Sequence, residues 1–95
     1  MEILDSLTGK IEKDDEKGAW HWLAVPSDLN ELIKNLPQGH FGFVPITAKL
    51  SSSQWDTSFL PAGDGSYFLT IPAKVRKAQE ISLGDTVTIE FAPRQ

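Results

Sequence analysis

Three basic residues close together form the main cluster of side chains in this sequence that could do chemistry. Lys74, Arg76 and Lys77 lie within four consecutive positions. Such a cluster can bind an anion, because guanidinium and ammonium groups donate charge-assisted hydrogen bonds to oxyanions. Arg76 could instead pair with Asp85 across the following turn and fix its geometry, and this structural role is the favoured one.

Tryptophans and one glycine-rich turn supply the other candidate binding residues. Trp20, Trp22 and Trp55 could line a cleft or stack on planar ligands, as aromatic platforms do in single-strand binders. We expect two of the three in the core and one partly exposed, with Trp20 and Trp22 on one face of a strand. Asp64 lies in Gly63-Asp64-Gly65, where backbone N–H groups could hold a phosphate. A hairpin turn is the favoured interpretation, because no helix follows directly.

No pattern of residues points to a reaction or to a metal ion. His21 and His40 stand alone, on a strand and in a loop, without the carboxylates that would complete a metal site or a triad. Ser51-Ser52-Ser53 lacks the glycine spacing of a nucleophile elbow. The acidic run Glu12–Gly18 lacks the spacing of a calcium loop and is expected to be a solvated hairpin loop. We therefore predict no catalytic residue, no metal site and no cofactor.

Size and charge limit the class of protein. The chain has 95 residues, of which 40% are hydrophobic and 23% charged, and it has no cysteine. This composition predicts one small globular domain over residues 1–95, in a reducing, cytoplasmic location. No apolar run is long enough to cross a membrane.

Net charge argues against nucleic acid as the partner. The chain carries −4, and the residues up to Thr47 hold four lysines against eight carboxylates. The remaining residues are balanced, with five basic and five acidic side chains. An acidic surface repels polyanions, so the acidic balance disfavours nucleic acid, although a local basic patch can act at contact range.

Alternation of apolar and polar residues predicts a mostly β chain. Strands are expected where the apolar residues recur with a period of two. Pro45, inside one of these strands, indicates an edge strand or a bulge. The predicted strands are Ile3–Ile11, Trp20–Val25, Val44–Leu50, Trp55–Phe59, Tyr67–Ile71 and Val87–Phe91.

Two helices are expected between these strands. Ser27 could cap the first, an amphipathic helix of about ten residues. Its apolar residues recur at helical spacing: Leu29, Leu32, Ile33 and Leu36. Pro72 begins a shorter helix. Its residues expected to face inward are Val75, Ala78 and Ile81.

Two segments of the chain resemble each other. Trp22–Leu29 aligns with Phe68–Val75 at an offset of 46 residues, each reading aromatic, Leu, small, branched, Pro, small, charged, aliphatic. A glycine ends the helix in both segments, at Gly39 and Gly84. The pattern predicts a duplicated strand–helix–strand unit, over about residues 18–50 and 64–92, whose copies close one barrel around a pseudo-twofold axis.

Residues 68–87 resemble the swapped-hairpin signature of AbrB and MazE type transcription factors, with Ile71-Pro72, an arginine in the helix and Gly84-Asp85. Over nearly its whole length the chain resembles the domain-of-unknown-function family nineteen-oh-five. The motifs that carry this resemblance are Ala19-Trp20, Val25-Pro26, Trp55-Asp56-Thr57-Ser58, Pro61–Gly65, Ile71–Lys77 and Gly84-Asp85.

The resemblance implies mainly a fold. The family's domain is similar to a small double-split β-barrel, related in shape to AbrB but formed within one chain. DNA binding belongs to the AbrB branch, and Lys74, Arg76 and Lys77 match its basic positions after Ile-Pro. The first half of this chain departs from that pattern because it is acidic.

These observations predict a mainly β fold, a small double-split β-barrel of about seven strands with two short helices. The predicted function is a non-enzymatic cytoplasmic binding or interaction module. Its partner is expected to be a protein or a small molecule and not a membrane, with a monomer favoured over a homodimer. The predicted contact surface comprises Lys74, Arg76, Lys77, Asp64 in the Pro61–Gly65 turn, Trp55 and Trp20.

Two alternatives stay open at this point. One is an AbrB-like DNA-binding transcriptional regulator that acts through the basic cluster. The other is a barrel with a small-molecule pocket and an enzymatic activity of its own.

Overall fold

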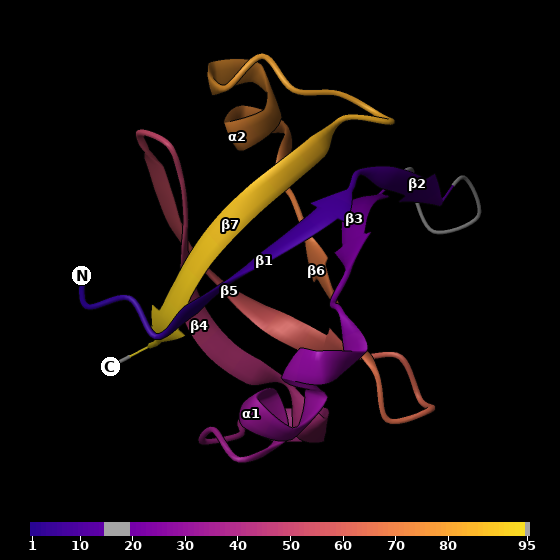
Figure 1. The fold of residues 1–95 in the computed structure, drawn as a ribbon, viewed down its shortest axis with the longest axis vertical. Helices are drawn as coiled ribbons and strands as arrows, with labels where there is room; N and C mark the ends of the chain where they lie inside the picture. The colour runs from indigo at the N-terminus through magenta and orange to yellow at the C-terminus, as the bar shows by residue number, and fades with distance from the viewer. Residues whose placement is uncertain (15–19, 95) are drawn as a thin grey trace.

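A computed structural model describes residues 1–14 and 20–94. The described residues form seven strands and two short α-helices, shown in Figure 1. The strands are β1 (Asp5–Lys10), β2 (Glu12–Asp14), β3 (Trp20–Ala24), β4 (Val44–Leu50), β5 (Ser53–Pro61), β6 (Tyr67–Thr70) and β7 (Thr86–Pro93). The α-helices are α1 (Asn30–Lys34) and α2 (Ala73–Ala78), and short 3-10 helices span Ser27–Leu29 and His40–Gly42.

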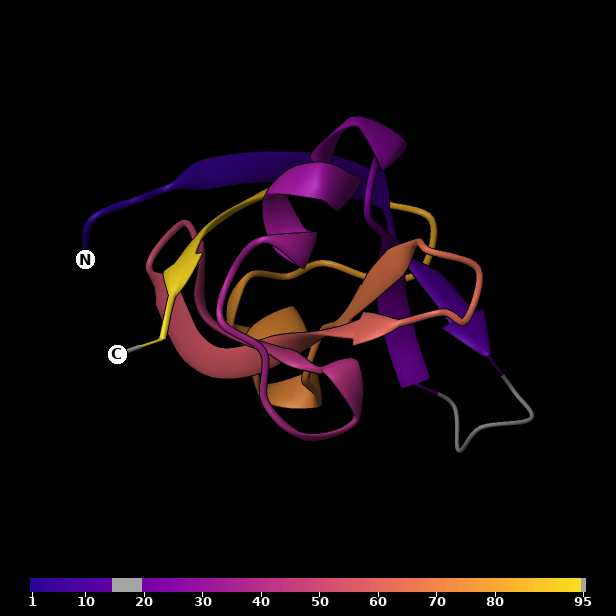
Figure 2. The same cartoon turned by 90° about the horizontal axis from the view of Figure 1, so that it is seen from below.

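The strands make one antiparallel sheet that curls into a nearly closed barrel (Figure 2). Their order is β1-β7-β4-β5-β6-β3-β2. The two outermost strands, β1 and β2, follow each other directly along the chain, so the polypeptide itself joins the two ends of the sheet. The predicted small, mainly β barrel with two short helices is therefore confirmed.

Ile11 is the point where the first strand passes from one side of the barrel to the other. Its N–H donates to the carbonyl of Asp85 and its carbonyl accepts from the N–H of Gly84, both at 2.9 Å. The sequence predicted a single strand over Ile3–Ile11 followed by a loop. The strand instead begins at Asp5, with Ile3 exposed, and continues through Glu12–Asp14 as β2.

Gly9 lies where the barrel closes between β1 and β3. A Cβ atom at this position would lie 3.1 Å from Cδ2 of Leu23 and 3.4 Å from the carbonyl oxygen of Ala24. The first distance is shorter than an ordinary van der Waals contact, and the second is at its lower limit. Glycine, which has no side chain, therefore lets the two strands approach each other.

The core follows the predicted alternation along β4 and β7. Every second residue of β4 is buried, from Val44 to Leu50, and Val87, Ile89 and Phe91 of β7 are buried as well. Phe91 packs edge-to-face on Phe59 of β5, with ring centroids 4.9 Å apart. These side chains fill the barrel, since residues i and i+2 of a strand point to the same face.

Pro45 was predicted to indicate an edge strand or a bulge, and this prediction is wrong. β4 is an interior strand between β5 and β7. The carbonyl of Pro45 accepts from the N–H of Arg94, just beyond the last residue of β7. The backbone nitrogen of Pro45 therefore also points toward the end of β7. Because proline has no N–H, the sheet loses only one hydrogen bond there, at the end of the pairing between β4 and β7.

The helices are shorter than predicted, and two details of the prediction are wrong. Pro26 precedes the 3-10 helix, and Ser27 is its first residue and makes no capping hydrogen bond. Leu29 and Ile33 are buried, with Leu32 and Leu36 packed against the core. In α2 Val75 faces inward as expected and Ile81 packs against the core, but Ala78 is exposed because the helix ends there.

Strand pairing relates the two similar segments symmetrically. β3 of the first pairs with β6 of the second, and Leu23 lies opposite Leu69, the residue aligned with it in sequence. β4 of the first pairs with β7 of the second, around Ala48 and Phe91. A pseudo-twofold arrangement of residues 18–50 and 64–92 requires this pairing, while the duplication itself remains a prediction.

Candidate functional site

The outer face of β3 carries large aromatic side chains. His21 and Leu23 point inward with Val25 beyond them, whereas Trp20 and Trp22 point to the other face. Trp20 is 50% exposed and Trp22 is half-buried. The prediction that two of the three tryptophans lie in the core is wrong, because the core face of this strand is the one with His21 and Leu23.

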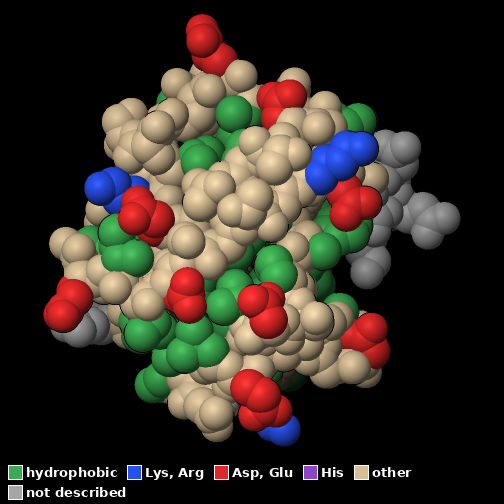
Figure 3. All heavy atoms as spheres, viewed as in Figure 1, with side chains coloured by type: hydrophobic (Ala, Val, Ile, Leu, Met, Phe, Trp, Pro, Cys, Tyr) green, Lys and Arg blue, Asp and Glu red, His purple; other side chains and the backbone are tan. Residues whose placement is uncertain are grey.

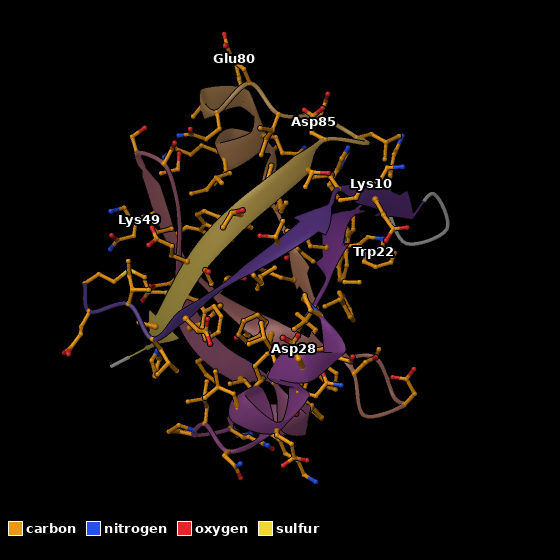
Figure 4. All side chains as sticks on the ribbon, viewed as in Figure 1. Lys10, Trp22, Asp28, Lys49, Glu80 and Asp85 are labelled. Atoms are coloured by element: carbon orange, nitrogen blue, oxygen red, sulfur yellow. The ribbon has the colours of Figure 1, made fainter. Side chains whose placement is uncertain are left out.

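β6 continues the aromatic surface next to β3. Phe68 lies opposite Ala24 of β3 and Leu60 of β5, on the outer side of the barrel. The rings of Trp22 and Phe68 meet edge-to-face, with centroids 6.1 Å apart and planes at 73°. Figure 4 shows Trp22 on β3 beside β2. We call the outward side chains of Trp20, Trp22 and Phe68 the aromatic face.

A groove of about 470 Å³ runs over this face. Its walls are mostly apolar, and the Pro61–Gly65 turn contributes to the lining through Pro61 and Ala62. The lining residues are Trp20, Trp22, Ala24, Pro61, Ala62, Ser66, Tyr67 and Phe68. We call this the aromatic groove.

A second hollow, of about 400 Å³, adjoins the groove at Trp20. It is lined by residues near the ends of β5 and β6, by the Ile71-Pro72 segment and by the start of α2. Arg76 is half-buried here, and its Nη1 donates a hydrogen bond to the carbonyl of Ile71. The lining residues are Trp20, Leu60, Thr70, Ile71, Pro72, Ala73 and Arg76. We call this the Arg76 hollow.

The three basic side chains of Lys74, Arg76 and Lys77 do not form one continuous surface. Lys74 and Lys77 are exposed on α2 and line neither hollow, whereas Arg76 points into one. The predicted pair between Arg76 and Asp85 is not formed. The Asp85 carboxylate instead accepts from the N–H of Ser82 at 2.9 Å and holds the turn before β7.

Asp64 is a turn residue, as the hairpin interpretation predicted. Its carboxylate accepts hydrogen bonds from the hydroxyl and the N–H of Ser66. These bonds stabilise the charged carboxylate and so lower the pKa of the Asp64 carboxyl. The bond from the hydroxyl has the larger effect and the bond from the N–H the next. Asp64 itself lies outside the aromatic groove, which Ser66 lines.

Trp55 lies on the other side of the sheet. It is opposite the buried Ala48 of β4 and packs half-buried against the core. Its indole Nε1 is buried without a hydrogen-bond partner. Trp55 is thus separate from Trp20, which lies on the outer face.

The histidines offer no shared site. His21 is half-buried, with Nδ1 lacking a partner, and His40 is exposed. Over residues 1–14 and 20–94, no three His, Cys, Asp or Glu side chains gather as a metal ion would need. The predicted loop over Glu12–Gly18 begins as β2, and its residues 15–18 lie outside the described residues.

A larger hollow, of about 700 Å³, lies between residues 1–4 and the strands β4, β5 and β7. Three of its polar side chains already form hydrogen bonds within the protein: the Thr47 hydroxyl donates to Asp56 at 2.9 Å, and Arg94 donates to the carbonyl of Thr57. The aromatic groove is therefore the better candidate for a binding site, because its lining is mostly apolar and does not consist of polar groups already hydrogen-bonded within the protein.

Sequence reasoning named Trp22 as a possible cleft residue but left it out of the predicted contact surface, and it missed Tyr67 and Phe68 altogether. The sequence signal for Phe68 was the similarity of the two segments, in which Trp22 aligns with Phe68 and Leu23 aligns with Leu69. With Leu23 and Leu69 in the core, their aromatic neighbours must point outward from both strands. Of the six predicted site residues, the structure brings Trp20 and Arg76 to one hollow and keeps Lys74, Lys77, Asp64 and Trp55 apart from it.

Acidic side chains are scattered over the face shown in Figure 3, where lysine and arginine are fewer. In the described part of the chain, no helix is both long and apolar enough to cross a membrane.

Fold and site together define a small antiparallel β-barrel with an aromatic groove on its outer surface. The chain belongs to the family described as Domain of unknown function (DUF1905), whose model matches residues 8–91. No curated protein matches the chain. The relation to the AbrB fold remains a prediction.

Proposed function

We propose that the domain is a cytoplasmic binding module, without a reaction of its own, whose contact surface is the aromatic face. The observation that carries the proposal is the outward position of Trp20, Trp22 and Phe68 around a groove of about 470 Å³. Aromatic side chains that a soluble domain leaves in contact with solvent commonly mark a binding site.

Packing of the core does not require the three side chains of the aromatic face. It is filled by aliphatic residues and by the Phe59–Phe91 pair, and none of the three aromatic-face residues belongs to it. Because these side chains are not needed to close the barrel, their apolar area is available to a ligand.

The groove is of a size that suits a small planar ligand. Sites for small molecules occupy roughly 300–1,000 Å³ and are lined by apolar and aromatic groups. Edge-to-face packing holds the ring of Trp22 on Phe68, so part of the wall is already ordered before a ligand binds.

Naphthamide, an uncharged planar probe, tests the proposal by NMR. We expect the indole N–H signals of Trp20 and Trp22 to shift during titration with a Kd of about 1 mM, from roughly 0.3 kcal/mol per heavy atom. The indole of Trp55, on the inner side of the sheet, serves as an internal control and should not shift.

Two variants separate binding from folding. Trp20→Ser should weaken naphthamide binding at least about fivefold with little change in Tm, because Trp20 is half exposed. Leu83→Ala removes an exposed apolar side chain outside both hollows and should leave binding unchanged. Equal shifts at all three indoles, or none, would overturn the proposal.

A further inference from the structure

Arg76 places a positive charge in the hollow next to the aromatic groove. It is the only charged residue among the described residues that line the hollow. A guanidinium carries five N–H donors in a planar fork, and here Nη1 uses one of them on the carbonyl of Ile71. The remaining donors have no protein partner within residues 1–14 and 20–94.

Trp20 links this charge to the groove. Trp20 lines both hollows, so a ligand ring that packs on Trp20 in the groove lies next to the hollow that holds Arg76. A half-buried guanidinium binds an oxyanion more strongly than an exposed one, because water screens it less.

Resting on the proposed function, we propose that the ligand of the aromatic face is a planar apolar molecule with a single carboxylate, and that Arg76 binds this carboxylate. The planar fork of arginine matches two carboxylate oxygens. Lys74 and Lys77 line neither hollow, so one guanidinium faces the ligand's charge. A dianionic phosphate would be poorly matched, since the chain carries a net charge of −4.

A pair of probes with the same shape tests the charge on the unmodified protein. Naphthoate and naphthamide differ in whether the group on the ring is a carboxylate or a neutral amide. We expect naphthoate to bind about tenfold more tightly at low salt, the effect of one charge-assisted contact. The difference should shrink as salt is added, because part of the guanidinium is exposed to solvent.

Two charge-removing variants on the same helix assign the effect to a residue. Arg76→Gln should bring naphthoate to the affinity of naphthamide, whereas Lys77→Gln, which removes the same charge from an exposed position, should keep the tenfold difference. Thermal unfolding of both variants checks that α2 remains in place.

The outcomes distinguish the two proposals. Equal affinity of both probes for the unmodified protein, or a difference that survives Arg76→Gln, would overturn the role of Arg76 and leave the groove intact. Binding of neither probe would overturn both proposals. Tighter binding of naphthyl phosphate than of naphthoate would contradict the assignment of a single carboxylate.

Discussion

Ser66 connects the aromatic groove to the turn that contributes to its lining. It lines the groove, and it donates two hydrogen bonds to Asp64, one from its hydroxyl and one from its N–H. The lowered pKa of Asp64 is therefore a measure of how well this turn is formed.

Ser66→Ala removes the hydroxyl bond and should raise the pKa of Asp64 toward its ordinary value. The rise is expected to be partial, because the N–H of residue 66 still donates. The carboxyl carbon of Asp64, followed by NMR through the acid range, gives the measurement. Ser58→Ala, on β5 outside the turn, is the control and should leave the Asp64 titration where it was.

The sign of the pH effect follows from the direction of the shift. A carboxyl whose pKa is lowered by folding stabilises the folded state above its unfolded pKa, and this contribution is lost as the pH falls through the folded pKa. Ser66→Ala should therefore reduce the acid-induced loss of stability. An unchanged titration of Asp64 in this variant would contradict the assigned cause.

Single residues were also where sequence reasoning failed most. Trp20-His21-Trp22-Leu23 has apolar residues on both faces of a strand, so periodicity alone does not say which face is buried. Size favoured the tryptophans, whereas the structure buries Leu23 completely and exposes half of Trp20. Arg76 was found as a candidate, but its partner was not, since the carbonyl that it binds leaves no sequence signal.

At the scale of elements, the close approach of β1 and β3 makes Gly9 a sensitive position. Gly9→Ala should destabilise the domain by about 1–3 kcal/mol, the cost of overpacking, because the new methyl group would meet Leu23 at 3.1 Å. Urea unfolding followed by tryptophan fluorescence measures the loss. Lys10→Ala, at an exposed position of the same strand, should change stability by no more than about 0.5 kcal/mol.

α1 covers one side of the core with Ile33, which is fully buried. Ile33→Ala should cost about 2–5 kcal/mol, through lost apolar burial and the cavity that remains. The exposed neighbour Lys34 provides the control: Lys34→Ala should be nearly neutral. A small loss at Ile33, equal to that at Lys34, would mean that the helix is not part of the core.

Elements with one buried face could be predicted well, and those with other constraints could not. β4 and β7 followed their alternation because apolar and polar residues separate cleanly there. The break at Ile11 could not be predicted, since it depends on hydrogen bonds to Gly84 and Asp85, distant in the chain. Pro45 was misjudged because its tolerance depends on where a neighbouring strand ends.

At the scale of the whole molecule, the symmetrical pairing explains how so short a chain closes a barrel. Each strand–helix–strand segment contributes one strand to each of the two cross-pairings, β3 with β6 and β4 with β7. β5 lies between these two pairs and joins them into one sheet, and β1 and β2 extend the sheet at its two outer ends. The start of β1 lies beside the last residues of β7, with which it pairs (Figure 1).

This closure leads to a prediction about the oligomeric state. A chain that supplied only one strand–helix–strand segment would need a second copy to complete both cross-pairings, and its dimer would be obligate. Here both pairings form within one chain, so we expect a monomer in sedimentation velocity experiments over a wide range of concentration.

Any weak self-association is expected to form through the exposed aromatic face. The variant Trp20→Ser distinguishes such a dimer from one in which two chains exchange strands of the barrel. Association through this face should depend on concentration and disappear in the variant, because half of the Trp20 surface is free to make contacts. A dimer that persists on dilution and is insensitive to Trp20→Ser would mean that strands are exchanged between chains. That result would contradict closure of the barrel by a single chain.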